Sequence, residues 1–218
     1  MENYPLSRKN RIRLASAFRG VPRMDLTLDC VIEDQMGTAR VDCASHPAVF
    51  EVQIGPFLYF AGDAACPAAR DLIRAIPPFT FIMPSAEGWL EAIRAQHGEE
   101  LREFDRYNFS PEGLSAAHLE DLLRASPCSE GVRRMDASFI ERCQDQPDFL
   151  DISAYESSLD FLERGIGFYL MQGDTIAGTA YGSLACSRGI EVSLFVGEDY
   201  RQRGIATALA ARLLGWCL

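Results

Sequence analysis

A short turn in the last part of the sequence has the residue types of an anion-binding site. It reads YRQRGIAT, residues 200–207, and joins an alternating apolar segment to a strongly apolar one. Gly204 would let the backbone approach a ligand closely, and the N–H groups of a helix that begins there would have no intrahelical partner. The helix dipole, Arg201 and Arg203 would add positive charge, which suits a diphosphate. The alternative, equally compatible with local physics, is a tight strand-to-helix turn with two solvated arginines.

The segments on either side of this turn have the periodicities of a strand and a helix. Residues 189–197 alternate, so successive side chains point to opposite faces of a strand. One face carries Ile190, Val192, Leu194 and Val196, and the other carries Glu191, Ser193 and Phe195. Residues 204–218 place apolar side chains on two helical stripes, so this helix needs cover on two sides.

Residues 201–206, Arg-Gln-Arg-Gly-Ile-Ala, resemble the Q/R-x-x-G-x-G/A signature of the GCN5-related N-acetyltransferases, the GNAT superfamily. The helix and three strands expected before the turn are similar to that family too, and the resemblance covers residues 130–218. The segment SLDFLERGIGFYLMQGDTIAGTAYGS, together with HPAVFEVQIGPFLYFAGD, looks like the branch that includes the zwittermicin-resistance-type acetyltransferases. The implied fold is the acyl-CoA N-acyltransferase fold, of class α/β with a mixed sheet.

The resemblance implies acetyl-CoA as co-substrate. In the family this molecule lies where two strands of the sheet splay apart, with its pantetheine arm on one of them. Carried over by position, the pantetheine contacts would be Leu194, Phe195 and Val196. The pyrophosphate loop would consist of Arg201, Gln202, Arg203, Gly204, Ile205, Ala206 and Thr207.

Glu191 stands ten residues before Arg201, where many family members carry a glutamate. In the family a free amine attacks the thioester carbonyl, so a carboxylate that removes the proton of the amine serves as general base. The resemblance makes Glu191 the candidate base; the alternative is an exposed strand residue or one paired with an arginine. The leaving thiolate needs an acid, commonly a tyrosine after the fifth strand, and no residue of this sequence matches it.

Other polar residues give weaker signals. The three histidines, His46, His97 and His118, are isolated and show no metal-ligand spacing, so we expect no metal site. Near the helix that lines the acceptor site in relatives lie Tyr155, Asp160 and Glu163. Residues of these types are ordinarily found on helix surfaces.

The first half of the chain is expected to form an α/β domain of its own, residues 1–126, before an acetyltransferase domain at 127–218. A polar stretch, LLRASPCSEGVRR, marks this boundary. The patterns predict a hairpin over 26–42, two strands over 48–62, a helix over 66–76, a short strand over 77–84, a helix after Ser85 as its N-cap, and a strand from 101. Three aromatic residues fall at core spacing: Phe79, Phe81 and Trp89.

The family fold continues after the helix at 204–218 with a further strand, so the sequence suggests a C-terminally incomplete fold whose cleft has one wall. The preferred explanation is that the chain is a fragment. The other is that the N-terminal domain folds across to supply the second wall. Its strand and helix order is similar to the back half of an acetyltransferase, as a degenerate copy without the R-x-x-G-x-A turn. Pairing of residues 77–84 beside 190–196 is the observation that would favour the second explanation.

The composition fits an ordinary globular protein, with 48% hydrophobic and 24% charged residues. A formal net charge of −10 argues against nucleic acid and anionic membranes as partners, and no apolar run approaches the ~18 residues of a membrane span. The seven cysteines show no C-x-x-C spacing, which indicates reduced thiols in the cytoplasm. We expect a cytoplasmic N-acetyltransferase that acts on a small-molecule amine such as an antibiotic or metabolite, with a homodimer left open. The alternative is a non-catalytic acyl-CoA-binding or regulatory domain.

Overall fold

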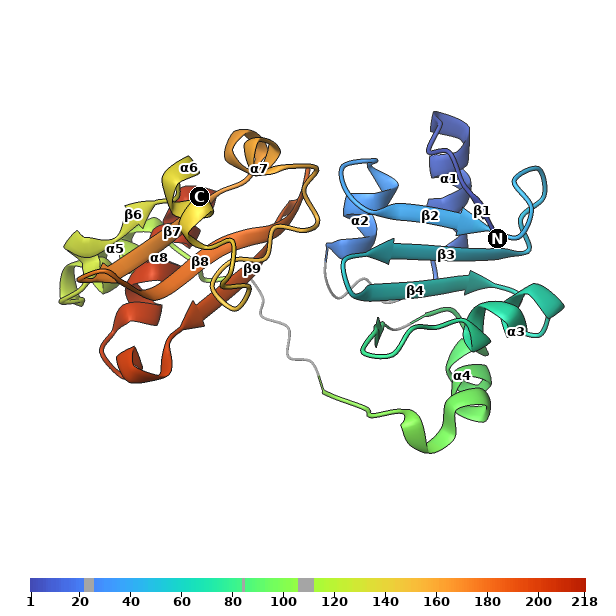
Figure 1. Cartoon of the computed structure of the whole chain (residues 1–218). Helices are drawn as coiled ribbons and strands as arrows, with labels where there is room; N and C mark the ends of the chain where they lie inside the picture. The colour runs from blue at the N-terminus through green and yellow to red at the C-terminus, as the bar shows by residue number, and fades with distance from the viewer. Residues whose placement is uncertain (22–25, 84, 106–111) are drawn as a thin grey trace. The chain divides into compact units, whose positions relative to one another are not determined.

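A computed structural model describes residues 1–21, 26–83, 85–105 and 112–218. The chain divides into two compact units, Met1–Asn108 and Phe109–Leu218 (Figure 1). The boundary expected at residues 126 and 127 lies later, at the end of helix α5 (Ala116–Ala125). That helix packs on helix α8 (Ile205–Cys217) of the second unit, which is why it belongs there. No helix among the described residues is both long and apolar enough to cross a bilayer.

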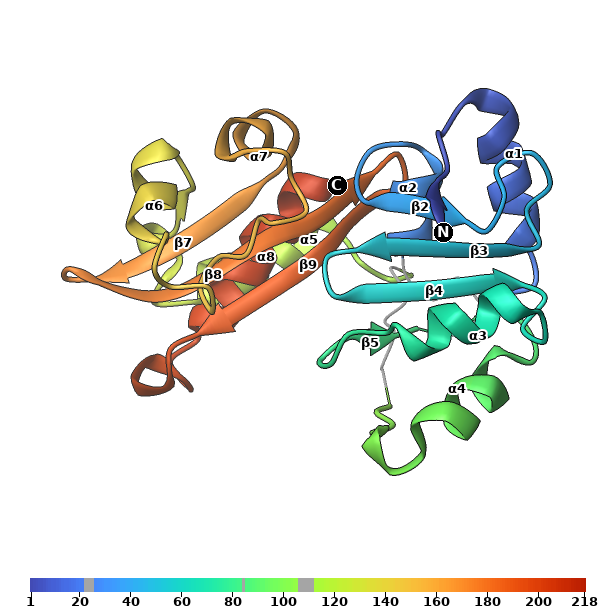
Figure 2. The ribbon, with the colours of Figure 1, turned by 45° about the vertical axis from the view of Figure 1, so that its right-hand side comes forward.

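The N-terminal unit contains one five-stranded sheet with helices on both faces (Figure 2). Its elements are β1 (Glu2–Asn3), α1 (Arg8–Ala17), α2 (Thr27–Ile32), β2 (Thr38–Val41), β3 (Val49–Ile54), β4 (Phe57–Gly62), α3 (Pro67–Arg74), β5 (Phe81–Ile82) and α4 (Trp89–His97). The sheet order is β1-β2-β3-β4-β5, in which β4 and β5 are parallel and the other pairs antiparallel. The strands over 48–62 and the helix over 66–76 are therefore confirmed in kind.

Four expectations for this unit were wrong. Residues 27–32 form a helix and not the first strand of a hairpin; Thr27–Val31 are all buried, and a short buried run has no periodicity that separates strand from helix. Phe79 is 99% exposed and Phe81 is 52% exposed, whereas Trp89 is fully buried as predicted. Helix α4 begins at Trp89 with Gly88 as its N-cap, and the Ser85 Oγ instead accepts from the Phe60 N–H of β4. Residues 101–105 form no strand, and the rest of that predicted strand falls on residues 106–111, outside the described residues.

The C-terminal unit contains a four-stranded antiparallel sheet. After α5 come β6 (Arg133–Arg134), α6 (Ala137–Arg142), α7 (Ser158–Arg164), β7 (Gly167–Gln172), β8 (Thr175–Cys186), β9 (Gly189–Val196) and α8. The sheet order is β6-β7-β8-β9. The helix and three strands expected before the turn are present as α7, β7, β8 and β9, and the closing helix is present as α8.

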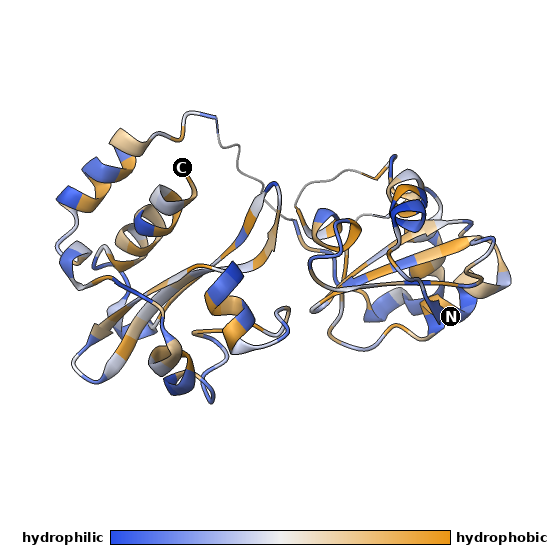
Figure 3. Cartoon of the chain, turned by 90° about the horizontal axis from the view of Figure 1, so that it is seen from above, coloured by the Kyte–Doolittle hydropathy of each residue, from blue (hydrophilic) through white to orange (hydrophobic). Residues whose placement is uncertain are grey.

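Helices cover the two faces of this sheet differently. Helix α8 packs along β7, β8 and β9, and Leu209 lies against Gly178, where a side chain would meet it at 3.1 Å. The helix is coloured mainly orange and pale where it ends at the label C in Figure 3, in keeping with its apolar sequence. On the opposite face the ring of Phe139 in α6 stacks on Tyr169 of β7, with centroids 3.8 Å apart. One face is therefore closed by an apolar helix, and the other by short helices and the loop between them.

The two units contain the same run of elements. In each, a strand is followed by two helices, three antiparallel strands and a further helix, and the four strands occupy the same order in the sheet. In this correspondence β4 and α3 of the first unit match β9 and α8 of the second. The first unit adds β5, which pairs with β4 of its own sheet, so residues 81 and 82 do not extend the sheet that contains β9.

Candidate functional site

The turn between β9 and α8 has an unusual backbone. After Gly197 and a short 3-10 turn at Glu198–Tyr200, Gln202 and Gly204 both adopt left-handed conformations, with φ of +63° and +79°. Gly204 is the N-cap residue of α8 and offers no side-chain oxygen to the helix. Most helices have a Ser, Thr, Asp or Asn at this position, whose side chain would satisfy one of the free N–H groups. The start of α8 is thus left uncapped by any side chain.

The first amides of α8 form a concentrated set of hydrogen-bond donors. The helical ladder begins with the Ala208 N–H, which donates to the Gly204 carbonyl oxygen at 3.0 Å. The three preceding amides, of Ile205, Ala206 and Thr207, have no intrahelical acceptor by helix geometry. Ala206 and Thr207 are exposed, whereas the Ile205 side chain is buried in the core. Ile205 can therefore offer a ligand its backbone only. This arrangement can bind an anion such as a pyrophosphate.

The arginines of the turn point to neighbours within the turn. The Arg201 Nε donates to the Val196 carbonyl oxygen at 3.3 Å, and its NH1 lies 3.6 Å from Glu198 Oε1. The Arg203 guanidinium lies over the Tyr200 ring, 5.7 Å from its centroid. Both arginines are exposed, so these contacts contribute little and can be exchanged for a bound phosphate at small cost.

A segment that the sequence marked only as a boundary supports this turn. The Ser126 Oγ donates to the Gly204 carbonyl oxygen at 3.4 Å, and the Cys128 Sγ donates to the Arg203 carbonyl oxygen at 3.3 Å. Two carbonyls of the turn are thereby turned toward residues 126–128. Local sequence patterns could not predict these two hydrogen bonds, because each joins residues more than 70 positions apart.

Strand β9 presents the three residues expected to contact the pantetheine arm. Among the described strands it pairs with β8 alone and lies at the edge of the sheet. Leu194 is 43% exposed, Val196 packs against the core beside α8, and Phe195 meets the ring of Phe149 edge-on at 4.9 Å. An edge strand has backbone N–H and C=O groups on its open side that can pair with an extended partner containing amides.

Glu191 lies on β9 five residues before Val196, about 17 Å along an extended strand. By alternation it shares a face with Ser193 and Phe195, the face that also carries α6, α7 and their connecting loop. It is half-buried, and it lies opposite Leu184 at an irregularity in β8. The structure therefore places the candidate base on the same strand as the pantetheine positions, toward the opposite end from the turn.

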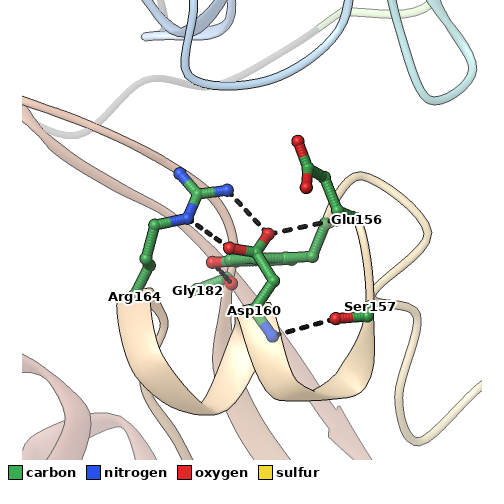
Figure 4. Close-up of polar contacts among 6 residues, drawn as sticks. Glu156, Ser157, Asp160, Arg164 and Gly182 are labelled. Atoms are coloured by element: carbon green, nitrogen blue, oxygen red, sulfur yellow. Dashed lines mark hydrogen bonds and ion pairs between the residues drawn. The ribbon is translucent and has the colours of Figure 1, made fainter.

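The three residues expected near the acceptor site differ in their surroundings. Glu163 is exposed, as predicted, but Tyr155 is buried and its hydroxyl donates to the Gly182 carbonyl oxygen at 2.9 Å. Asp160 accepts from the Arg164 guanidinium at 2.5 and 2.7 Å and from the Glu156 N–H at 3.1 Å (Figure 4). Tyr155 and Asp160 thus belong to a structured network, whereas Glu163 lies on the helix surface.

The Asp160 contacts lead to a prediction about acid stability. The hydrogen bond from Arg164 holds the pKa of Asp160 below its ordinary value of 3.8. Since the folded-state pKa is the lower one, the carboxylate stabilises the fold above pH 3.8 and loses this contribution as the pH falls through the folded-state pKa. An i,i+4 pair contributes about 0.3–0.5 kcal/mol. Asp160→Asn should therefore lower Tm slightly at neutral pH and match wild type below the folded-state pKa. Thermal melts across this range, with Asp174→Asn in a hairpin turn as control, check it; a deficit that persists in acid contradicts it.

The corresponding place in the N-terminal unit, between β4 and α3, is built differently. The β4 and β5 strands stay paired there, because the Phe60 N–H donates to Ser85 Oγ at 2.9 Å and the Ala86 N–H donates to the Phe60 carbonyl oxygen at 3.0 Å. An adjacent hollow of about 360 Å³ has two carboxylates in its lining, those of Asp63 and Glu87. Joined strands leave no room for a pantetheine arm, and the carboxylates repel a pyrophosphate.

The cysteines show no sign of a metal centre or a disulfide. All seven are free, and among the described residues no three His, Cys, Asp or Glu side chains gather as metal ligands would. Their thiols differ in acidity. Burial raises the pKa of Cys143 to about 11, while a hydrogen bond with Ser45 lowers the pKa of the exposed Cys43 below its ordinary value of 9.0.

This difference predicts the order of alkylation. The thiolate is the nucleophile, so iodoacetamide at mildly alkaline pH should modify Cys43 at least about a hundredfold faster than Cys143. Peptide mass spectrometry of samples quenched at increasing times measures both rates, and a Cys43→Ser variant identifies the fast site. Equal rates at the two cysteines would show that the described burial of Cys143 is wrong.

The chain is similar to a known protein family in sequence and to a solved structure in fold. A family model described as GNAT acetyltransferase matches residues 17–218, and so extends over both units. A crystal structure of a GCN5-related N-acetyltransferase-like protein from Streptococcus suis is similar over 96% of this chain and 84% of that chain, with a TM-score of 0.80 and 24% sequence identity. At that identity the likeness concerns the fold. No protein with a curated description matches the chain.

Proposed function

The chain belongs to the GNAT acetyltransferase family and is thus an acyltransferase, and from this premise we propose that it transfers the acetyl group of acetyl-CoA to the amine of a small molecule. The observation that carries the proposal is the start of α8. The Gly204 N-cap gives no side-chain acceptor to the first three amides of α8, which follow an edge strand of the described sheet. A pyrophosphate joined to an extended, amide-containing arm suits both features.

In this proposal the pyrophosphate binds the turn formed by residues 201–207. The amides of Ile205, Ala206 and Thr207 donate to its oxygens, and the helix dipole adds to the attraction. The Arg201 side chain exchanges its exposed contact with Glu198 for the phosphate. The pantetheine arm then follows β9 past Val196, Phe195 and Leu194 toward Glu191.

We assign Glu191 the role of general base. An ammonium group has no lone pair, so Glu191 must first accept a proton from the amine, directly or through a water. The amine nitrogen then forms a bond to the acetyl carbonyl carbon, and the bond from that carbon to sulfur breaks with its electron pair on sulfur. The nitrogen loses its extra proton to the leaving thiolate, which gives the amide and the free thiol of CoA. The half-buried position of Glu191 on β9 supports this role, since it faces the side of the sheet where α6, α7 and their loop could hold an acceptor.

One acetyl-CoA per chain follows from the comparison of the two units. The N-terminal unit repeats the element order, but Ser85 joins its β4 and β5 strands, and carboxylates lie at its α3 turn. We propose that this unit is a degenerate copy that binds no CoA.

The proposal also covers the class of the acceptor amine and the cellular compartment of the protein. The resemblance to the zwittermicin-resistance branch favours an antibiotic or metabolite amine, and the seven free cysteines favour the cytoplasm. A net charge of −10 also favours a cationic acceptor over a polyanion. A homodimer remains compatible with these features.

Two measurements on the purified chain test the function. Calorimetric titration with acetyl-CoA measures binding, and release of the CoA thiol measures turnover with putrescine, lysine, glucosamine and an aminoglycoside as acceptors. Binding with a stoichiometry of one, together with thiol release that depends on an amine, supports the proposal. Binding without turnover favours the alternative, a non-catalytic acyl-CoA-binding or regulatory domain. Failure to bind acetyl-CoA contradicts both.

A further inference from the structure

Strand β8 contains a bulge directly opposite Glu191. Gly182 pairs with Val192, and Leu184 pairs with Glu191, so Ser183 is an extra residue in β8. The Ser183 Oγ donates to the backbone carbonyl oxygen of Glu191 at 3.3 Å. Without this extra residue, the pairing beyond Gly182 would shift by one, and side chains there would change faces relative to β9. Bulges of this kind commonly redirect a side chain next to an active site.

The first residue of the bulge is held on its other side by Tyr155. The Gly182 N–H donates to the Ile166 carbonyl oxygen at 2.9 Å, and the Gly182 carbonyl oxygen accepts from the Tyr155 hydroxyl at 2.9 Å. Strand β7 begins only at Gly167, so a phenol takes the place of the backbone donor that a longer strand would supply. Both polar groups of Gly182 are therefore bound.

Tyr155 in turn is fixed by α7. The residue is only 6% exposed; its ring meets Phe161 edge-on at 5.1 Å, and the Arg164 guanidinium lies 5.8 Å from its centroid. Asp160 orients that guanidinium through two hydrogen bonds, and Ser157 caps the helix by accepting from the Asp160 N–H (Figure 4). The chain of contacts runs from the first turn of α7 through Tyr155 to the bulge.

We propose that Tyr155 is a positioning residue for acyl transfer, which holds the β8 bulge and so sets the position of Glu191. The inference rests on the proposed role of Glu191 as base. A small displacement of a catalytic group is enough to lower the rate by up to about a hundredfold. The hydrogen bond from the Tyr155 hydroxyl to the Gly182 carbonyl oxygen restricts the position of the bulge more narrowly than packing of the ring alone.

The test is Tyr155→Phe, which keeps the ring and its contacts with Phe161 and Arg164 and removes the hydroxyl. We expect kcat to fall by about ten- to a hundredfold with an unchanged KM for acetyl-CoA. In a Glu191→Gln background the same change should cause no further loss, because both act on one step. Hydrogen exchange of residues 182–192 should become faster. Tyr169→Phe, on neighbouring β7, is the matched control and should leave kcat and this exchange as in wild type.

Each outcome bears on one of the two proposals. Unchanged kcat in Tyr155→Phe, or a loss that is equally large in the Glu191→Gln background, overturns the positioning role while the base remains supported. Unchanged exchange over residues 182–192 also overturns it, and this readout needs no acceptor. Wild-type activity in the Glu191→Gln single variant overturns the assignment of Glu191 as general base, and with it the positioning role of Tyr155.

Discussion

Gly204→Val should weaken binding of acetyl-CoA by about tenfold to a hundredfold for each hydrogen bond lost from the turn. A hydrogen bond to a charged group contributes about 1.5–3 kcal/mol, and 1.4 kcal/mol corresponds to a factor of ten in Kd. Gly204 has φ of +79°, which a β-branched residue adopts only under strain. The effect does not come from a clash, since a Cβ there would lie 3.6 Å from Ser126 Oγ and 3.8 Å from Pro127 Cδ.

Calorimetry on the variant measures this change in Kd directly. Gly215→Ala is the matched control, because Gly215 lies within the same helix and a Cβ there would meet nothing within 4 Å. It should leave Kd unchanged and stabilise the helix by roughly 0.5–1 kcal/mol. Wild-type affinity in Gly204→Val would show that the backbone of this turn does not bind the pyrophosphate.

Glu191→Gln should lower kcat by about a hundredfold or more while leaving the Kd for acetyl-CoA unchanged. A positioned general base contributes about 10²–10⁴ to a rate, and glutamine has the same shape but cannot accept the proton. The pH dependence of kcat should also become flatter, since the ionisation of Glu191 no longer limits it. The separation of kcat from Kd distinguishes loss of a base from disruption of β9.

Steady-state kinetics across pH, with the best acceptor of the amine panel, measures both effects. Asp174→Asn serves as control because Asp174 is an exposed carboxylate in the turn between β7 and β8. It should retain wild-type kcat and pH profile. A Glu191→Gln variant with unaltered kcat would leave Glu191 as an ordinary strand residue, the alternative that its sequence position also allowed.

The turn at residues 201–207 and its flanking elements could be predicted because their signals are local. Alternation over 189–197 fixes the faces of β9, and apolar spacing fixes α8. The left-handed backbone of Gln202 could not be predicted in this way, since glutamine has no preference for it. The burial of the Ile205 side chain at the start of α8 likewise depends on how α8 packs on the sheet.

Features that depend on distant contacts could not be predicted from sequence patterns. Ser126 and Cys128 look like part of a polar boundary until α5 packs against α8 and brings them to the turn. Tyr155 looks like a surface residue until the loop folds over β8 and buries it. The repeated element order of the two units is similarly a property of topology, which sequences can lose while the fold remains.

At Phe79 the local sequence pattern gave a wrong prediction, since it placed an exposed residue in the core. Its aromatic side chain follows two prolines and fits a buried strand by composition, yet it is almost fully exposed at φ of +60°. The prolines restrict the backbone before it, and the strand that follows is only two residues long. Hydrophobicity alone does not place a residue inside a protein.

Hydrogen–deuterium exchange with and without acetyl-CoA tests the central claim most directly, because it reports on the amides that are proposed to bind. Addition of acetyl-CoA should slow exchange in peptides that cover residues 191–196 and 201–208. Peptides that cover the corresponding turn of the N-terminal unit, residues 62–67, should exchange as before. Protection at residues 62–67, or none at residues 201–208 under saturating acetyl-CoA, would contradict the assignment of the site to the β9–α8 turn.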